Sequence, residues 1–164
     1  MRLHALVAGA AMFLGACAAQ PPDPVTVSEV NVTADMSSIG NRNAVRYWQN
    51  LGTDLEAAMA AEFVGHVDPA GRIVNVDIDE LSLSNIMTAD RVSEDARLAG
   101  QVEVVGADGT STYNVSATTR DVATFLPADA NITTIPPTSQ QFYGAVVRAF
   151  ARGVAEVVLG VPDA

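Results

Sequence analysis

Residues 72–85 read RIVNVDIDELSLSN, and they carry the clearest structural pattern in the chain. Every second residue from Val74 to Ile78 is apolar, so an extended backbone places the apolar and the polar side chains on opposite faces. After Glu80 the apolar residues change parity, which a β-bulge accommodates. The stretch therefore predicts a strand with one buried face and a bulge near Glu80.

Three further segments have the composition of strands. Residues 25–32 carry four valines and change face near Ser28, where a second bulge is expected. Residues 98–104 and 113–117 also carry spaced apolar side chains. Between these two segments stands Asp108–Gly109, a tight-turn dipeptide. We therefore expect the last two strands to form a hairpin.

Two segments have helical periodicity instead. Apolar residues recur at steps of three and four over residues 43–66, although a capping box at Thr53 allows the helix to break or restart there. A second capping box at Thr138 begins another apolar helical run, and Gly160 ends it. The long helix after Thr138 is the firmest structural prediction.

The order of these elements is strand, helix, three strands, helix. It predicts an α+β domain over residues 25–160, with a four-stranded, largely antiparallel sheet and both helices packed on one face. About 148 residues follow position 16, enough for one domain with a sizeable core but not for two. By element order alone, this domain resembles small α+β envelope lipoproteins of the lipopolysaccharide-assembly and transport-auxiliary kinds.

The beginning of the chain has the pattern of an export signal. Arg2 precedes an apolar run over residues 5–14 that is too short for a permanent span, since a bilayer core needs about 20 apolar residues. The next residues, LGAC at 14–17, resemble the lipobox of bacterial lipoproteins. That resemblance covers residues 1–17 only. It implies a signal peptide over residues 1–16, cleavage between Ala16 and Cys17, and diacylglycerol plus an N-acyl chain on Cys17.

The alternative is an ordinary secretory signal followed by an accidental cysteine. Cys17 is the only cysteine in the chain and stands where the motif requires it, which favours lipidation. Residues 17–24 would then form the lipidated cysteine and a proline-rich tether. Residue 18 is alanine, and in the lipoprotein family this favours the periplasmic face of the outer membrane over the inner membrane. The membrane, reached through the lipid anchor, is the first expected partner.

Composition limits the chemistry of the mature chain. Eight arginines stand against 19 acidic residues after the signal, a formal charge of about −11, which disfavours nucleic acid as a partner. No cysteine other than Cys17 and no histidine other than His66 remain. We therefore expect no catalytic residues, no metal site and no cofactor apart from the lipid on Cys17.

The candidate binding residues lie in two long connections, residues 84–97 and 120–137. Connectivity places both at one end of the sheet, opposite the hairpin and the tether. Their apolar residues are either an exposed contact patch for a partner or side chains that fold back to close the core. These candidates are Ile86, Met87, Phe125, Leu126, Ile132 and Ile135.

The expected function is non-enzymatic: a lipid-anchored module that binds an envelope protein and assists envelope assembly or transport. One alternative is a periplasmic hydrolase that uses His66 with the acidic strand cluster of Asp77, Asp79 and Glu80. These carboxylates are more simply the solvated side of a half-buried strand. The other alternative is a purely structural lipoprotein.

Overall fold

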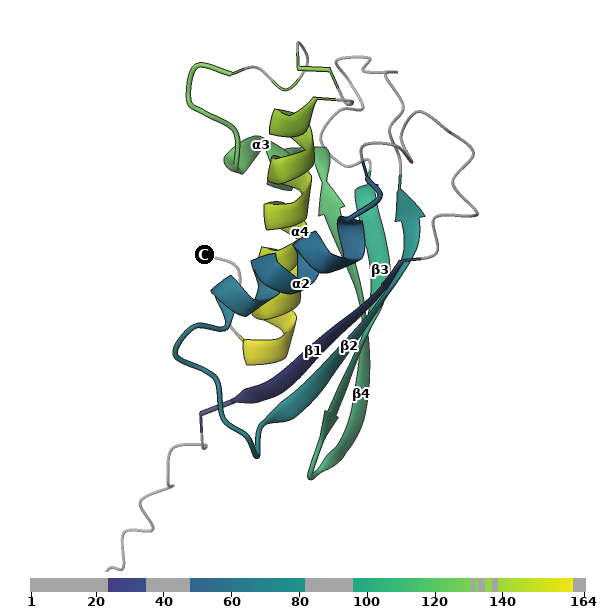
Figure 1. Cartoon of the computed structure of the whole chain (residues 1–164), viewed down its shortest axis with the longest axis vertical. Coiled ribbons are helices and arrows are strands. Elements are labelled where there is room, and N and C mark those ends of the chain that lie inside the picture. The colour runs from purple at the N-terminus through teal and green to yellow at the C-terminus, as the bar shows by residue number, and fades with distance from the viewer. Residues whose placement is uncertain are drawn as a thin grey trace, which may run out of the picture.

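The computed structural model describes residues 24–34, 48–81, 96–130, 132, 135–136 and 139–160. In these residues, four strands form one sheet in the order β1-β2-β3-β4 (Figure 1). The strands are β1 (Val27–Ala34), β2 (Arg72–Leu81), β3 (Ala96–Gly106) and β4 (Gly109–Thr118). The helices are α2 (Leu51–Glu62), α3 (Thr119–Thr124) and α4 (Gln140–Leu159). This arrangement confirms the predicted α+β class.

The sheet is mixed but largely antiparallel. β1 pairs with β2 in parallel because the connection between them contains α2, which crosses back over the sheet. β2, β3 and β4 follow one another antiparallel. The β3–β4 turn lies at Ala107–Asp108, and Gly109 follows with a φ of 123°, so the predicted hairpin is confirmed.

Both predicted bulges are present. The β1–β2 register shifts between Val27 and Glu29, and the β2–β3 register shifts between Ile78 and Glu80. Each shift moves the apolar residues that follow it back onto the core face. Beside the second shift stands Gly100, where a Cβ atom would lie 2.4 Å from the carbonyl oxygen of Asp77. Only glycine fits at that position without movement of the backbone.

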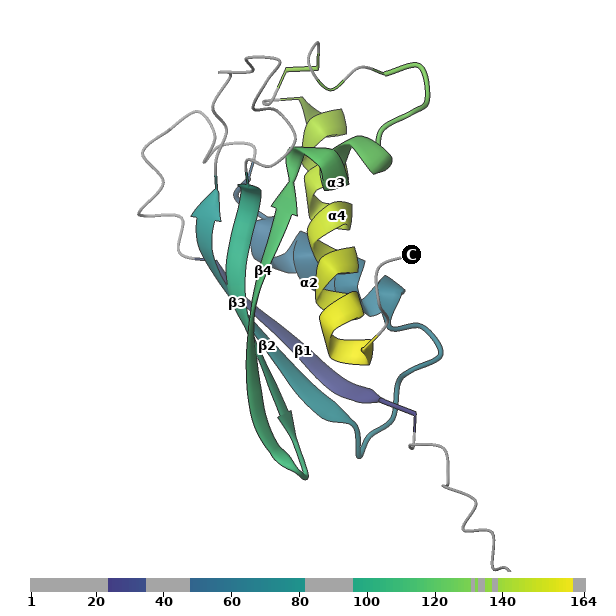
Figure 2. The same ribbon diagram turned by 180° about the vertical axis from the view of Figure 1, so that it is seen from behind.

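The helices α2 and α4 cover the same face of the sheet, as predicted, whereas the opposite face carries no helix from the described part of the chain (Figures 1 and 2). The core lies between these two layers. Its largest fully buried side chains include Trp48, Phe63, Phe142, Phe150, Leu51, Leu55 and Met59.

The capping predictions are wrong in detail. α2 follows Asn50, whose side chain makes no capping bond, and Thr53 lies inside the first turn. Burial explains this start, because Leu51 is 1% exposed and its packing adds a turn before the predicted cap. Residues 43–47 of the predicted helix lie outside the described residues.

The last helix begins one residue later than predicted. Its N-cap is Ser139, whose hydroxyl accepts a hydrogen bond from the amide of Phe142 at 3.2 Å, while the Phe142 side chain is buried in the core. The helix ends at Gly160, which has a φ of 67°, so the predicted C-terminal signal is confirmed.

The sheet has two distinct ends. Val27 pairs with Arg72, and Arg72 lies against Gly106 beside the hairpin turn, so β1 begins at the hairpin end, as predicted. At the other end, the first residue of β3 pairs with Thr118, the last of β4. Among the described residues, no helix is long and apolar enough to cross a bilayer.

Candidate functional site

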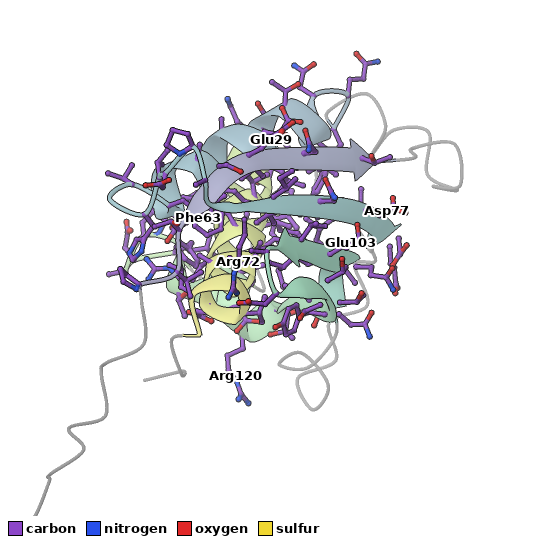
Figure 3. The ribbon with its side chains drawn as sticks, turned by 90° about the horizontal axis from the view of Figure 1, so that it is seen from below. Glu29, Phe63, Arg72, Asp77, Glu103 and Arg120 are labelled. Carbon is purple, nitrogen blue, oxygen red and sulfur yellow. The ribbon has the colours of Figure 1, made fainter. Side chains whose placement is uncertain are left out.

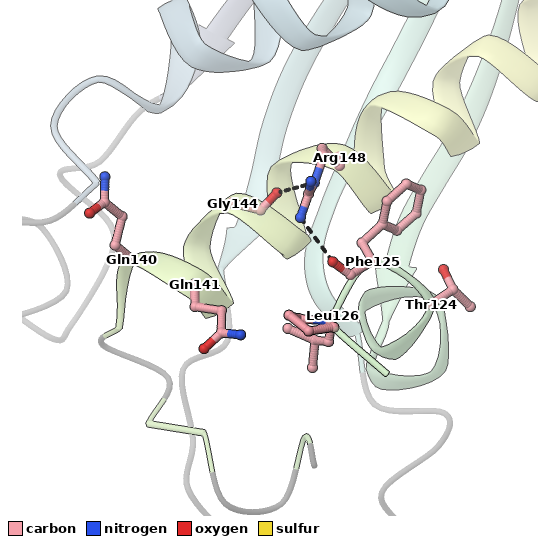
Figure 4. A pocket seen from close by; sticks show the side chains of 8 residues that line it. Thr124, Phe125, Leu126, Gln140, Gln141, Gly144 and Arg148 are labelled. Carbon is pink, nitrogen blue, oxygen red and sulfur yellow. Dashed lines mark hydrogen bonds between the residues drawn. The ribbon is translucent and has the colours of Figure 1, made fainter. Parts of the chain in front are cut away.

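A groove of about 780 Å³ opens between the end of α3 and the N-terminal half of α4 (Figure 4). α3 and the N-terminus of α4, which border it, lie at the end of the sheet away from the hairpin (Figure 1). Thr124, Phe125, Leu126, Pro127, Gln140, Gln141, Gly144 and Arg148 line it. Gln141 on α4 lies across the opening from Leu126 (Figure 4).

The α3 wall of the groove is held by local hydrogen bonds. A capping box starts α3, in which the amide of Thr118 donates to the carboxylate of Asp121 at 2.8 Å and the Thr118 hydroxyl accepts from the Asp121 amide at 3.3 Å. The chain then turns as the amides of Phe125 and Leu126 donate back to carbonyls within α3, at 3.1 and 3.2 Å. Phe125 and Leu126 therefore have defined positions although they follow the helix.

Arg148 joins the two walls. Its Nε donates to the carbonyl of Gly144 at 3.2 Å, and its Nη2 donates to the carbonyl of Phe125 at 2.8 Å (Figure 4). The guanidinium carbon also lies 5.8 Å from the centre of the Phe125 ring, within the range of a cation–π contact. A guanidinium has more N–H donors than these two bonds use, so Arg148 can still bind an oxygen of a ligand.

The groove combines apolar, amide and cationic groups. None of its eight lining residues is acidic, although the whole chain has a formal charge of −10. At Gly144 a Cβ atom would meet nothing within 4 Å, which leaves this part of the α4 surface open. Such a surface suits a polypeptide segment with an apolar side chain and a carbonyl or carboxylate oxygen.

The four predicted binding residues that the structure describes are half-buried. Phe125, Leu126, Ile132 and Ile135 all pack against the core, as the core-closing alternative requires. Phe125 and Leu126 also line the groove. The remaining candidates, Ile86 and Met87, and the lipidation residues Ala16 and Cys17 lie outside the described residues.

The structure does not bring His66 together with the acidic strand. His66 lies at the hairpin end, where its Nδ1 is 3.2 Å from the carbonyl oxygen of Val25 and its amide donates to the carbonyl of Phe63. Asp77 stands five residues along β2 from Arg72, the partner of Val27, which corresponds to about 17 Å. Figure 3 shows Phe63 well away from Asp77 and Glu103.

Asp77 and the neighbouring acidic residues lie on the uncovered face of the sheet, where they are exposed. Polar side chains link the strands there: Asn31 donates to Asn75 at 3.1 Å, and Asn75 donates to Glu103 at 3.2 Å. Within the described part of the chain, no group of three or more acidic, histidine or cysteine side chains is placed to hold a metal ion. This face has the character of a solvated sheet surface.

A second polar contact joins the two large helices behind the groove. The hydroxyl of Tyr143 on α4 donates a short hydrogen bond to the carboxylate of Asp54 on α2. The Tyr143 ring meets Trp48 edge to face, with centroids 4.8 Å apart and planes at 80°. Burial raises the pKa of Tyr143 above its usual range, and the hydrogen bond to Asp54 and its negative charge add to this effect. The contact therefore depends on a protonated Tyr143.

No protein-family model and no curated protein matches this chain. Among solved structures, a PelC dodecamer from Paraburkholderia phytofirmans is similar over 79% of this chain and 88% of that chain. The sequence identity is 11% and the TM-score is 0.31. A likeness at that TM-score supports no argument about this protein.

The sequence predicts only the α4 side of the groove. Gln141, Gly144 and Arg148 follow at steps of three and four, so they share one face of the predicted last helix. What covers this face is α3, which the sequence analysis missed. The sequence does contain a capping box for α3, because Asp121 follows Thr118 by three residues. No apolar helical run follows this capping box.

Proposed function

We propose that this protein is a lipid-anchored lipoprotein of the bacterial cell envelope, held through Cys17 at the periplasmic face of the outer membrane. It acts as a non-enzymatic module that binds an envelope protein and assists envelope assembly or transport. The binding site in this proposal is the groove between α3 and α4. Neither nucleic acid nor a metal cofactor has a part in it.

The observation that supports this proposal most is the position of the groove relative to the start of the domain. β1 begins beside the hairpin turn, whereas the groove lies beside the N-terminus of α4, at the far end of the sheet (Figure 1). A chain anchored through residues 17–24 would hold the hairpin end near the bilayer. The groove would then face away from the membrane, where another protein can reach it.

The chemistry of the groove suits a protein partner. Leu126 and Phe125 offer apolar contact, Gln141 offers an amide at the rim, and Arg148 offers a cation in a chain whose formal net charge is −10. An extended segment can place an apolar side chain over Leu126 and an oxygen on Arg148. The geometry does not support the hydrolase alternative. His66 lies beside the start of β1, whereas Asp77 lies opposite Thr33 near the end of that strand.

The anchor is tested with the full chain expressed in a Gram-negative host. The parent is expected to fractionate with membranes and to carry diacylglycerol on residue 17 by mass spectrometry. The Cys17→Ser variant is expected to lose the lipid, to keep its signal uncleaved and to change its fractionation. A Cys17→Ser form that is processed and fractionates like the parent would contradict the anchor.

The groove is tested by site-specific photocrosslinking in cells. A photoreactive residue replaces Gln141 at the groove, and in the control it replaces Gln101, which is also exposed but lies on the uncovered face of β3. We expect one envelope protein to crosslink at position 141 and not at position 101. A second change, Arg148→Glu, is expected to reduce that crosslink by roughly tenfold, which corresponds to about 1.4 kcal/mol.

Two outcomes contradict the proposed binding site. Equal adducts at positions 141 and 101 indicate nonspecific contact. Absence of any adduct at position 141, in cells where the protein is anchored, supports the purely structural lipoprotein instead.

A further inference from the structure

β4 is the last strand of the sheet, and no residue that the structure describes pairs with its outer edge. The strand covers ten residues, GTSTYNVSAT, and contains no charged residue and no proline. Such a strand presents about 33 Å of backbone at the edge. Natural sheets usually protect an edge with lysine, proline, a bulge or a covering element, because unpaired N–H and C=O groups pair with other strands. β4 contains neither lysine nor proline, and the register shift of the β3–β4 pair lies only at its last residues, opposite Ala96–Leu98.

The opposite edge of the sheet is protected. The amide of Val27 donates to the carbonyl of His66 at 2.8 Å, and the amide of Asp68 donates to the carbonyl of Val27 at 3.1 Å. Further along β1, the amide of Val32 donates to the carboxylate of Glu56 on α2 at 3.3 Å. The segment after α2 and α2 itself therefore occupy parts of the β1 edge, whereas no described residue occupies the outer edge of β4.

The helices cover only one part of β4. Val115 and Ala117 are buried beneath α4, whereas the residues from Gly109 to Asn114 are exposed on both faces. Tyr113 is 37% exposed and is one of the few large apolar side chains at the surface of the described residues. The strand is thus fixed at one end by the core and accessible along its edge.

We propose that β4 pairs antiparallel with β4 of a second copy of this chain, about a two-fold axis at Asn114. The pairing joins two four-stranded sheets into one continuous sheet of eight strands. It closes after two copies, because the β1 edges at both ends of the joined sheet are protected. Tyr113 of each copy is buried at the junction.

The distribution of charge favours a second copy of this chain as the partner of β4. The charged residues at the two ends of β4 suggest how the two strands align. The chain carries ten more acidic than basic residues, so most of its surface repels another copy, but β4 brings no charge to the contact. Centring the pair on Asn114 brings Asp108 of one copy, in the turn before β4, to the same end of the contact as Arg120 of the other, in the first turn of α3. Both side chains are exposed, and Arg120 projects away from the domain (Figure 3). The two-fold axis then gives two complementary charge pairs.

The test is a cysteine scan of β4 in the full chain, oxidised in isolated envelopes and separated without reductant. Side chains opposite each other on paired strands have Cβ atoms about 4.5–5.5 Å apart, close enough for a disulfide to form with slight adjustment. We expect Asn114→Cys to form a disulfide-linked dimer. Thr112→Cys and Ser116→Cys would stand about 13 Å from their own copies and are expected not to crosslink alone.

Mixing two variants makes the test sharper. In the proposed register Thr112 of one copy faces Ser116 of the other, so coexpression of Thr112→Cys with Ser116→Cys is expected to restore the crosslink. Thr33→Cys on β1, exposed at the protected edge, is the matched control and is expected to give only background. Equal yields at all β4 positions and at Thr33 would falsify the pairing. A disulfide to a different protein overturns the choice of a second copy.

The parent chain, whose only cysteine is Cys17, serves as a separate test of the anchor, because only an unlipidated Cys17 can form a disulfide. A free thiol at position 17 raises the background in every variant but leaves the dependence on β4 position unchanged. Failure of lipidation and failure of β4 pairing are therefore distinguishable.

A change of charge gives an independent readout in solution. Asn114→Lys brings two cations together on the two-fold axis and is expected to weaken dimerisation of the detergent-solubilised full chain by tenfold or more, measured by sedimentation. Thr33→Lys, the same kind of change on β1, is expected to leave it unaltered. An Asn114→Lys protein that dimerises like the parent overturns the proposal.

Discussion

Removing one hydroxyl, in Tyr143→Phe, is expected to lower stability by an amount that depends on pH. At neutral pH the Tyr143 hydroxyl donates to the Asp54 carboxylate. A hydrogen bond to a charged group contributes about 1.5–3 kcal/mol, and solvent reduces this value because both side chains are only half-buried. We expect the variant to be less stable than the parent by about 1–2 kcal/mol at pH 7.

The sign of the pH dependence follows from the raised pKa of Tyr143. Unfolded chains lose the tyrosine proton near pH 10, whereas the folded protein retains it to higher pH. Above pH 10 the unfolded state therefore binds fewer protons, and stability falls as pH rises. The advantage of the parent over Tyr143→Phe is therefore expected to shrink as pH rises from 10 to 11.

The chain is well suited to this measurement. It contains no lysine, so tyrosine is the main side chain that titrates between pH 9 and 12, and Trp48 is its single tryptophan. Urea unfolding of the purified protein is followed by Trp48 fluorescence at intervals across that range. Tyr113→Phe is the control, because Tyr113 is partly exposed on β4 and has no part in the Asp54 contact.

A stability difference between parent and Tyr143→Phe that stays constant from pH 7 to 11 would refute the reasoning. It would mean that Tyr143 ionises equally readily in the folded and the unfolded chain. The same conclusion follows if Tyr113→Phe shows the larger pH dependence.

Three further stability predictions use the same urea assay. Gly100→Ala places a Cβ atom 2.4 Å from the carbonyl oxygen of Asp77, so we expect a loss of about 2 kcal/mol or more, and an unchanged midpoint would contradict the close approach. Gly144→Ala meets nothing within 4 Å inside α4 and is expected to gain about 0.5–1 kcal/mol, which a lower midpoint would exclude. Ser139→Ala removes the N-cap of α4 and is expected to cost about 1 kcal/mol, whereas Ser139→Asp, which can also cap, should retain most of the stability.

Local patterns account for the parts of the fold that the sequence predicts. Alternation in residues 72–80 and the change of parity after Glu80 give both the strand and its bulge, because side-chain direction along a strand depends only on position in the chain. Gly160 ends the last helix for a similar reason, since its left-handed conformation is a property of one residue. The predicted caps at Thr53 and Thr138 are wrong, because α2 begins at the buried Leu51 and the hydroxyl of Ser139 caps α4 through the amide of Phe142.

The candidate site is predicted less completely. Phe125 and Leu126 were expected near the end of the sheet away from the hairpin, and they line the groove there. For Arg148, helical spacing gives only a shared face of the last helix with Gln141 and Gly144. Arg148 donates to the carbonyl of Phe125, which lies 23 residues earlier in the chain. Spacing within one helix cannot predict a contact over that separation.

The sequence by itself determined the order of the four strands and the two long helices, the two bulges and the hairpin, and it predicts the export signal and the lipid anchor. These features depend on neighbouring residues, whose relative directions follow from backbone geometry. Only the tertiary structure decided that α3 and α4 border a groove, that Tyr143 contacts Asp54, and that described residues bond to the β1 edge but not to the β4 edge. Each of these depends on residues far apart in the chain, which come together because burial of the shared core packs both helices on one face of the sheet.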